Sequence, residues 1–261
     1  MIAMVGSYRF HCPPQTMKNI LIASALFISG AFAAEPNYAI NPVPRDGGWV
    51  KRHESFNAIS KQGTATLVFL GDSITQGWEG KGKATWEKFY AKRNAANFGI
   101  GGDRTEHVLW RLDNGNFDGL KPKLIVLMIG TNNTGHVGRA QKELNGAIYA
   151  SSAEQTAEGV KAIIGKLQTK APEAKILLLG IFPRGEKPTD AMRQQNEATN
   201  AIIAKLADGK QVHFMDIGKT FLQPDGTLTR EVMPDLLHLS EKGYYMWAEA
   251  IDPKIKELLG E

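Results

Sequence analysis

Five short apolar runs, separated by longer stretches with helical spacing, constrain the fold of this chain most strongly. The run at residues 124–129 contains six consecutive apolar residues and should be buried on both faces. The other runs are 65–70, 95–100, 176–182 and 212–215. Helical patterns lie at 49–59, 86–90, 105–112, 153–167, 189–206 and 240–259. This alternation predicts an α/β fold with a parallel sheet and helices on both faces.

The composition is that of an ordinary globular protein. Of 261 residues, 43% are hydrophobic and 22% are charged, so one domain can bury a core without disulfides or metal. The 31 basic and 27 acidic residues are scattered rather than gathered in runs. We therefore expect no nucleic-acid partner.

The N-terminus has the pattern of a secretory signal peptide. Lys18 precedes an apolar run at 20–28, and small residues at 31 and 33 complete a cleavage pattern. The run is too short to span a bilayer of about 30 Å, so no membrane span is predicted. We predict a signal peptide over residues 1–33, with cleavage after Ala33 or Ala34, and a secreted or periplasmic location.

The translation start stays open, and the position of the only cysteine limits the chemistry of the mature chain. Residues 1–16 are either translated or an over-long gene start, with translation then beginning at Met17. They hold the only cysteine, Cys12, so the mature chain has no thiolate for catalysis or metal binding. A loop rich in Pro, Gly and Asn follows at 34–48, and a single domain is predicted over 49–261.

Ligands of parallel sheets bind at the carboxyl ends of the strands, and the first strand ends close to Ser73. A serine in this strand-to-helix turn exposes its hydroxyl, and its N–H lies at a helix N-terminus that favours negative charge. The alternative is that Ser73 only caps the helix.

The second and third strands also end in residues suited to catalysis. Gly99, Gly101 and Gly102 permit a tight turn and close approach to a ligand. Arg104 stands where a dinucleotide-binding fingerprint requires glycine, so that motif is absent. Asn132 follows the third strand, where its amide can either donate to an oxyanion or cap the next helix.

Near the C-terminus, Asp235 and His238 are three residues apart, within reach of each other in a turn. An aspartate that holds one imidazole nitrogen leaves the other free as a general base. A metal site is a poorer interpretation because only two ligands are clustered. A surface aspartate beside a packed histidine remains the third possibility.

Together these residues supply a nucleophile, a base, an orienting acid and three donors: the N–H groups of Ser73 and Gly102 and the Asn132 amide. Acyl transfer needs this set, because its tetrahedral intermediate carries a negative oxygen. Arg104 and Arg184 are either substrate contacts or ordinary surface residues, and His136 is a candidate for the pocket mouth.

The chain resembles the SGNH (GDSL) hydrolase family over most of its length after Trp49. The segments closest to the catalytic subunits of platelet-activating-factor acetylhydrolase are 97–103, 107–112, 130–133, 183–185 and 235–240. The resemblance implies Ser73 as nucleophile, Asp235 and His238 as its partners, and an oxyanion hole of Ser73, Gly102 and Asn132. It also implies a flavodoxin-like three-layer α/β/α sandwich with a five-stranded parallel sheet. The α/β-hydrolase alternative fails, because Thr75 occupies the second glycine position of Gly-x-Ser-x-Gly.

We therefore predict a secreted serine esterase that hydrolyses short acyl esters, with O-acetyl groups on carbohydrate as the expected substrate. Lipid or lysophospholipid esters are the alternative substrate, and a catalytically silent carbohydrate-binding protein is the rival class. No cofactor or metal is expected. The sequence leaves the oligomeric state, the natural substrate and the acyl-chain preference open.

Overall fold

A computed structural model describes residues 1, 2, 4, 6, 7, 9, 11 and 36–261. One compact unit spans Pro36–Glu261. Most of the predicted signal peptide, together with its cleavage site, lies outside the described residues. Among the helices that the structure describes, none combines the length and the apolar character that a membrane crossing requires.

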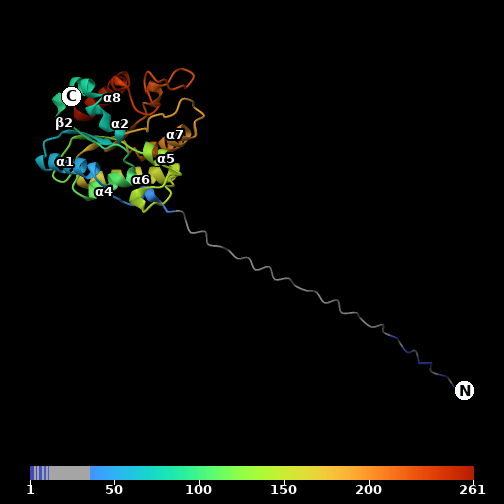
Figure 1. Ribbon diagram of the computed structural model, residues 1–261. Helices are drawn as coiled ribbons and strands as arrows, with labels where there is room; N and C mark the ends of the chain where they lie inside the picture. The colour runs from blue at the N-terminus through green and yellow to red at the C-terminus, as the bar shows by residue number, and fades with distance from the viewer. Residues whose placement is uncertain (3, 5, 8, 10, 12–35) are drawn as a thin grey trace. The chain divides into compact units, whose positions relative to one another are not determined.

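Five parallel strands form one sheet in the order β2-β1-β3-β4-β5 (Figure 1). Their bounds are β1 Leu67–Gly71, β2 Ala95–Gly99, β3 Leu124–Met128, β4 Lys175–Leu179 and β5 Val212–Met215. This strand order is that of the flavodoxin-like doubly wound fold. The predicted fold class is confirmed.

Helices cover both faces of the sheet. The bounds are α1 Gly48–Gln62, α2 Ser73–Gln76, α3 Lys83–Phe89, α4 Thr105–Asp113, α5 Thr131–Gly135, α6 Ala153–Lys170, α7 Ala191–Ile203 and α8 Glu241–Leu259. Helices α1, α4 and α6 lie on one side of the sheet, and α2 and α8 lie on the other (Figure 1). The layers are therefore those of an α/β/α sandwich.

Alternation along each strand divides the apolar residues between two cores, because successive side chains point to opposite faces. In β1, Val68 and Leu70 join the core under α1, α4 and α6, whereas Leu67 and Phe69 join the core under α3 and α8. Every residue of β1 and β3 is buried, as a central strand of a parallel sheet requires.

The fourth strand is shorter than the apolar run at 176–182 predicts. Ile181 and Phe182 are buried but leave the sheet. The Asn200 side chain replaces the neighbouring strand there: its Oδ1 accepts from the Ile181 N–H at 2.7 Å, and its Nδ2 donates to the Ile181 carbonyl at 2.9 Å. Because one amide satisfies both backbone groups, the chain can turn toward the site while remaining buried.

Residues 36–48, predicted as a loop, pack onto the domain. They contain a 3₁₀ turn, η1, at Tyr38–Ile40, and Ala39 is fully buried. The Thr105 hydroxyl at the start of α4 donates to the Ala39 carbonyl at 2.8 Å. This segment is thereby held beside the loop that follows β2, and its Arg45 reaches that loop.

Candidate active site

The sheet order brings three strand ends together. Strand β1 lies between β2 and β3 and is in register with both. Ser73 follows β1, so it stands between the glycine loop after β2 and Asn132 after β3. The predicted convergence of these residues follows from the parallel topology, in which carboxyl ends share one edge.

Ser73, His238 and Asp235 form a continuous hydrogen-bonded chain. The Ser73 Oγ lies 2.8 Å from the His238 Nε2, and the His238 Nδ1 lies 2.6 Å from the Asp235 Oδ2. These distances are those of a base within reach of a nucleophile and held by an acid. The structure thus brings the three predicted residues together.

A tight turn, not a helix, connects Asp235 to His238. The Asp235 Oδ1 accepts from the N–H groups of Leu237 and His238, at 3.1 and 2.7 Å. Leu236 takes the left-handed conformation, with φ of 60°, which costs a residue with a Cβ about 1–2 kcal/mol. One carboxylate therefore shapes the turn with Oδ1 and holds the imidazole with Oδ2.

The charge of Asp235 is stabilised locally, although the site is open. Burial opposes its ionisation, but hydrogen bonds from the His238 side chain and from the backbone outweigh burial and lower the Asp235 pKa. The His238 and Asp235 side chains are 43% and 57% exposed. Both side chains are therefore accessible from solvent.

Asp72, not Ser73, caps helix α2. The Asp72 Oδ1 accepts from the Ile74 N–H at 2.9 Å. The interpretation of Ser73 as a helix cap is therefore wrong, and its hydroxyl is left to His238. Asp72 is fully buried, its Oδ2 has no partner within 36–261, and burial raises its pKa to about 7.

The glycine loop presents one free N–H beside Ser73. The Gly101 N–H donates to the Gln76 Oε1 at 2.7 Å, whereas the Gly102 N–H has no hydrogen-bond partner in the described chain. Gly102 has φ of 76°, a conformation that favours glycine. The free donor is thus that of Gly102, the glycine chosen from the sequence.

Asn132 and Ser73 supply further donors. The Asn132 Nδ2 donates to the Asp103 carbonyl at 3.0 Å, which orients the amide and leaves one of its two N–H bonds for another acceptor. Asn132 does not cap α5, whose N-cap is Gly130. Ser73 is the first residue of α2, so its N–H has no acceptor within that helix.

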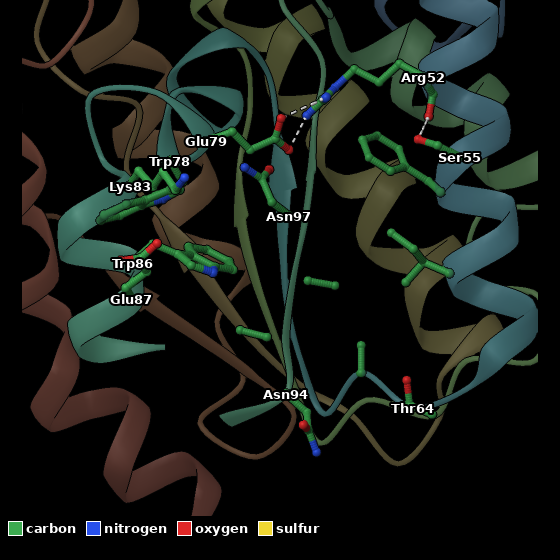
Figure 2. A pocket seen from close by; sticks show the side chains of 15 residues that line it. Arg52, Ser55, Thr64, Trp78, Glu79, Lys83, Trp86, Glu87, Asn94 and Asn97 are labelled. Atoms are coloured by element: carbon green, nitrogen blue, oxygen red, sulfur yellow. Dashed lines mark hydrogen bonds and ion pairs between the residues drawn. The ribbon is translucent and has the colours of Figure 1, made fainter. Parts of the chain in front are cut away.

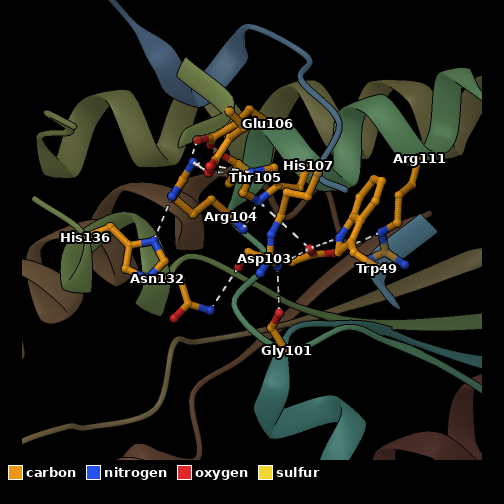
Figure 3. A network of polar contacts seen from close by, with 12 residues as sticks. Trp49, Gly101, Asp103, Arg104, Thr105, Glu106, His107, Arg111, Asn132 and His136 are labelled. Atoms are coloured by element: carbon orange, nitrogen blue, oxygen red, sulfur yellow. Dashed lines mark hydrogen bonds and ion pairs between the residues drawn. The ribbon is translucent and has the colours of Figure 1, made fainter. Parts of the chain in front are cut away.

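A buried polar network supports this side of the site (Figure 3). The Asp103 carboxylate accepts from the Trp49 Nε1 at 2.6 Å and lies 3.0 Å from the Arg111 Nε. Arg111 also donates to the carbonyl groups of Phe98 and Gly71, at 2.9 and 3.4 Å. The ends of β1 and β2 are thereby tied to the loop that carries Gly102.

Arg104 is not a substrate contact, since it is fully buried. It pairs with Glu106 and Glu143 and bonds the His136 Nδ1 at 2.7 Å. Burial and the Arg104 charge lower the His136 pKa to about 4. The Arg104 cluster therefore holds the loop after α5 against α4.

Arg184 lies at the site and is partly exposed. Its Nη1 donates to the Thr131 carbonyl at 2.7 Å and to the Thr131 Oγ1 at 3.2 Å. A Cβ on Gly135 would lie 2.6 Å from this Nη1, so the glycine leaves room for the guanidinium. Arg184 also lines a groove of about 430 Å³ that includes Asp235, Leu237, Asp190 and Met192.

A larger hollow of about 580 Å³ lies along the edge strand β2, between Arg52 and Ser55 of α1 and the side chains of Trp78 and Trp86 (Figure 2). No residue of the Ser73–His238–Asp235 chain lines it. The groove beside Arg184 is smaller, but Asp235 of that chain lines it. Contact with Asp235, not size, identifies the candidate substrate groove.

Comparison with known proteins identifies the family. Residues 69–246 match the model of the GDSL-like lipase/acylhydrolase family. The chain belongs to the GDSL-like lipase/acylhydrolase family. It is 36% identical to human platelet-activating factor acetylhydrolase IB subunit alpha1 over 235 residues, which cover 88% of this chain and 94% of the relative. The GDSL protein is accordingly a carboxylic ester hydrolase.

Solved structures share the fold. A GDSL-like lipase from Bacteroides thetaiotaomicron has a TM-score of 0.61 and 22% identity, over 79% of this chain and 97% of its own. An acetyl xylan esterase has a TM-score of 0.57 and 25% identity, over 72% of this chain and 98% of its own. The predicted family and enzyme class are confirmed.

Sequence reasoning missed three residues that shape the site. Gln76 holds the Gly101 N–H, Asp103 orients Asn132, and Arg45 donates to the Gly101 carbonyl at 2.7 Å. Gln76 and Asp103 stand within three residues of predicted site residues, which was a usable signal. Arg45 lies far upstream, and no local pattern connects it to the glycine loop.

The raised pKa of Asp72 predicts a pH-dependent stability. Between pH 4 and 7 the unfolded chain ionises this carboxyl while the folded protein keeps it neutral, so the free energy of unfolding falls as the pH rises. For a folded pKa of about 7, the loss is roughly 2–4 kcal/mol. Asp72→Asn cannot ionise, so its stability relative to wild type should increase from pH 4 to pH 7. Urea unfolding at several pH values measures this, and a constant difference would contradict it.

Proposed function

We propose that the protein is a serine esterase in which Ser73 is the nucleophile, His238 the general base and Asp235 the acid that orients His238. The 2.8 Å contact between the Ser73 Oγ and the His238 Nε2 is the observation that carries this proposal. The N–H groups of Ser73 and Gly102 and the Asn132 amide form the oxyanion hole.

Hydrolysis then proceeds through an acyl-enzyme. His238 takes the Ser73 proton as the Oγ bonds to the ester carbonyl carbon, and the electron pair of the C=O bond moves to the oxygen. The oxyanion hole binds that negative oxygen. When the intermediate collapses, the ester C–O bond breaks and His238 returns the proton to the leaving alcohol. Water repeats the sequence, releases the acid and restores Ser73.

Substitution of two serines separates catalysis from helix capping. Ser73→Ala should reduce para-nitrophenyl acetate hydrolysis by about 10⁴-fold or more, because the nucleophile is lost. Ser152, which caps α6 through the Gln155 N–H, is the matched control. Ser152→Ala should keep full activity and lose about 1 kcal/mol of stability. Wild-type rates in Ser73→Ala would exclude Ser73 as the nucleophile. Absence of hydrolysis in both proteins, or wild-type protein that resists fluorophosphonate labelling, would favour the silent binding protein.

For the substrate, we propose a short acyl ester, with O-acetyl groups on carbohydrate as the preferred class. Two observations support this choice. The His238–Asp235 pair is open to solvent, and the adjoining groove carries charged and polar groups from Arg184 and Asp190, suited to a hydroxyl-rich alcohol. A related structure is that of an acetyl xylan esterase. A lipid ester is the second candidate, favoured by the name of the platelet-activating factor acetylhydrolase relatives.

Substrate competition distinguishes these classes. We expect kcat/KM for acetylated xylo-oligosaccharides to exceed that for para-nitrophenyl dodecanoate and for a 1-alkyl-2-acetyl phospholipid, because Arg184, Asp190 and Asp235 place charged groups in the groove. All three are measured with the same enzyme preparation, with Ser73→Ala as the background control. Preference for the dodecanoate or the phospholipid would replace the carbohydrate proposal with the lipid one.

We place this activity in the periplasm or outside the cell, on the strength of the signal-like sequence at residues 17–33. Export with cleavage predicts a mature N-terminus at Ala34 or Glu35. N-terminal sequencing of the protein from a native host fraction measures this. A cytoplasmic protein that begins at Met1 or Met17 would contradict the proposed location without affecting the chemistry.

A further inference from the structure

Arg45 approaches the oxyanion hole from outside the family match. It belongs to the segment before α1, whereas the family model begins at residue 69. Its side chain is 32% exposed, and its Nη1 donates to the Gly101 carbonyl at 2.7 Å. A Cβ on Gly102 would lie 3.2–3.5 Å from the guanidinium, so Arg45 packs directly over this glycine.

The hydrogen bond from Arg45 is made to the peptide group that carries the free N–H of Gly102. The Gly101 carbonyl and the Gly102 N–H belong to one peptide group, and in a trans peptide they point in opposite directions. The described residues contain no cis peptide bond. Arg45 therefore holds the carbonyl on one side and directs the N–H to the other. A Cβ on Gly101 would lie 3.8 Å from the Ser73 Cβ, so this peptide is beside the nucleophile.

The Arg45 charge is only partly neutralised. Its nearest carboxylate oxygen is the Asp103 Oδ1, at 3.5 Å. That oxygen already accepts from Trp49, and the second oxygen of Asp103 pairs with Arg111. A charge-assisted bond to the carbonyl polarises the peptide and makes its N–H a stronger donor.

We propose that Arg45 is a positioning residue of the oxyanion hole, where its guanidinium orients and polarises the Gly101–Gly102 peptide. The inference rests on the proposed serine esterase function. It predicts a role in the transition state rather than in substrate binding, because the oxyanion exists only after attack. Loss of a whole oxyanion donor lowers kcat by about 10²–10³-fold, so a residue that acts through the donor should contribute about 10–100-fold.

Arg52 offers a matched control. It donates to the Gly99 carbonyl of the same loop at 2.7 Å, but Glu79 neutralises its charge through two bonds, and its peptide carries no oxyanion donor. Arg45→Gln should lower kcat for para-nitrophenyl acetate by about 10–100-fold with KM changed less than about threefold. Arg52→Gln should leave kcat within about twofold of wild type. Arg45→Lys keeps a charged donor and should recover part of the lost kcat.

A trifluoromethyl ketone gives a readout that a merely structural role would not move. The Ser73 Oγ adds to its carbonyl, His238 takes the proton, and the hemiketal oxygen carries the negative charge. Its affinity should fall in Arg45→Gln by the same factor as kcat/KM and stay unchanged in Arg52→Gln. If Arg45→Gln does not fold, Arg45→Lys is compared with wild type in the same two measurements, with a smaller parallel loss expected.

The outcomes separate this inference from the proposed function. Wild-type kcat in folded Arg45→Gln, or an equal loss in Arg52→Gln, overturns the inference while an inactive Ser73→Ala leaves the esterase mechanism standing. If only Arg45→Lys folds, unchanged kcat and unchanged ketone affinity in that variant overturn the inference. Full activity in Ser73→Ala overturns both.

Discussion

The buried pair of Asp103 and Arg111 is the interaction on which the site depends. Arg111 links the carboxylate to the carbonyl ends of β1 and β2, and the Asp103 carbonyl holds the Asn132 amide after β3. Three strand ends are thereby fixed relative to one another. Both side chains are fully buried, so removing one would leave an uncompensated charge and cost about 3–5 kcal/mol.

The two halves of the site differ in how they are held. On the side of the proposed oxyanion hole, the donors are partly or fully buried, and Asp103, Gln76 and Arg45 hold them through hydrogen bonds. The His238 side is an exposed turn, shaped by Asp235 and by a strained Leu236. Rigid donors suit a negative oxygen that forms only briefly, because preorganised dipoles need not rearrange. The exposure of His238, the proposed base, suits a bulky alcohol that must leave toward solvent.

Arg104 and Arg184 differ in burial and in their partners. Arg104 and Glu106 are buried in a network that fastens one loop, whereas Arg184 is fixed by one nitrogen and borders the groove beside Asp235. Both arginines follow predicted strands in the sequence and look equivalent there. Only their surroundings distinguish them, because Arg104 meets two carboxylates in the interior and Arg184 meets a backbone carbonyl at the surface.

The local sequence pattern determined the parallel sheet and the two helical layers, because apolar periodicity is a short-range property of the chain. It also placed Ser73 and Asn132 at strand ends and His238 near the end of the chain. It misjudged the end of β4, since the Asn200 amide that replaces the neighbouring strand comes from a later helix. Tertiary structure alone decided that Asp72 rather than Ser73 caps α2, that Gln76 takes the Gly101 N–H, and that Arg45 reaches the glycine loop. These contacts join residues whose meeting depends on packing between segments, and the sequence carries no periodic signal for them.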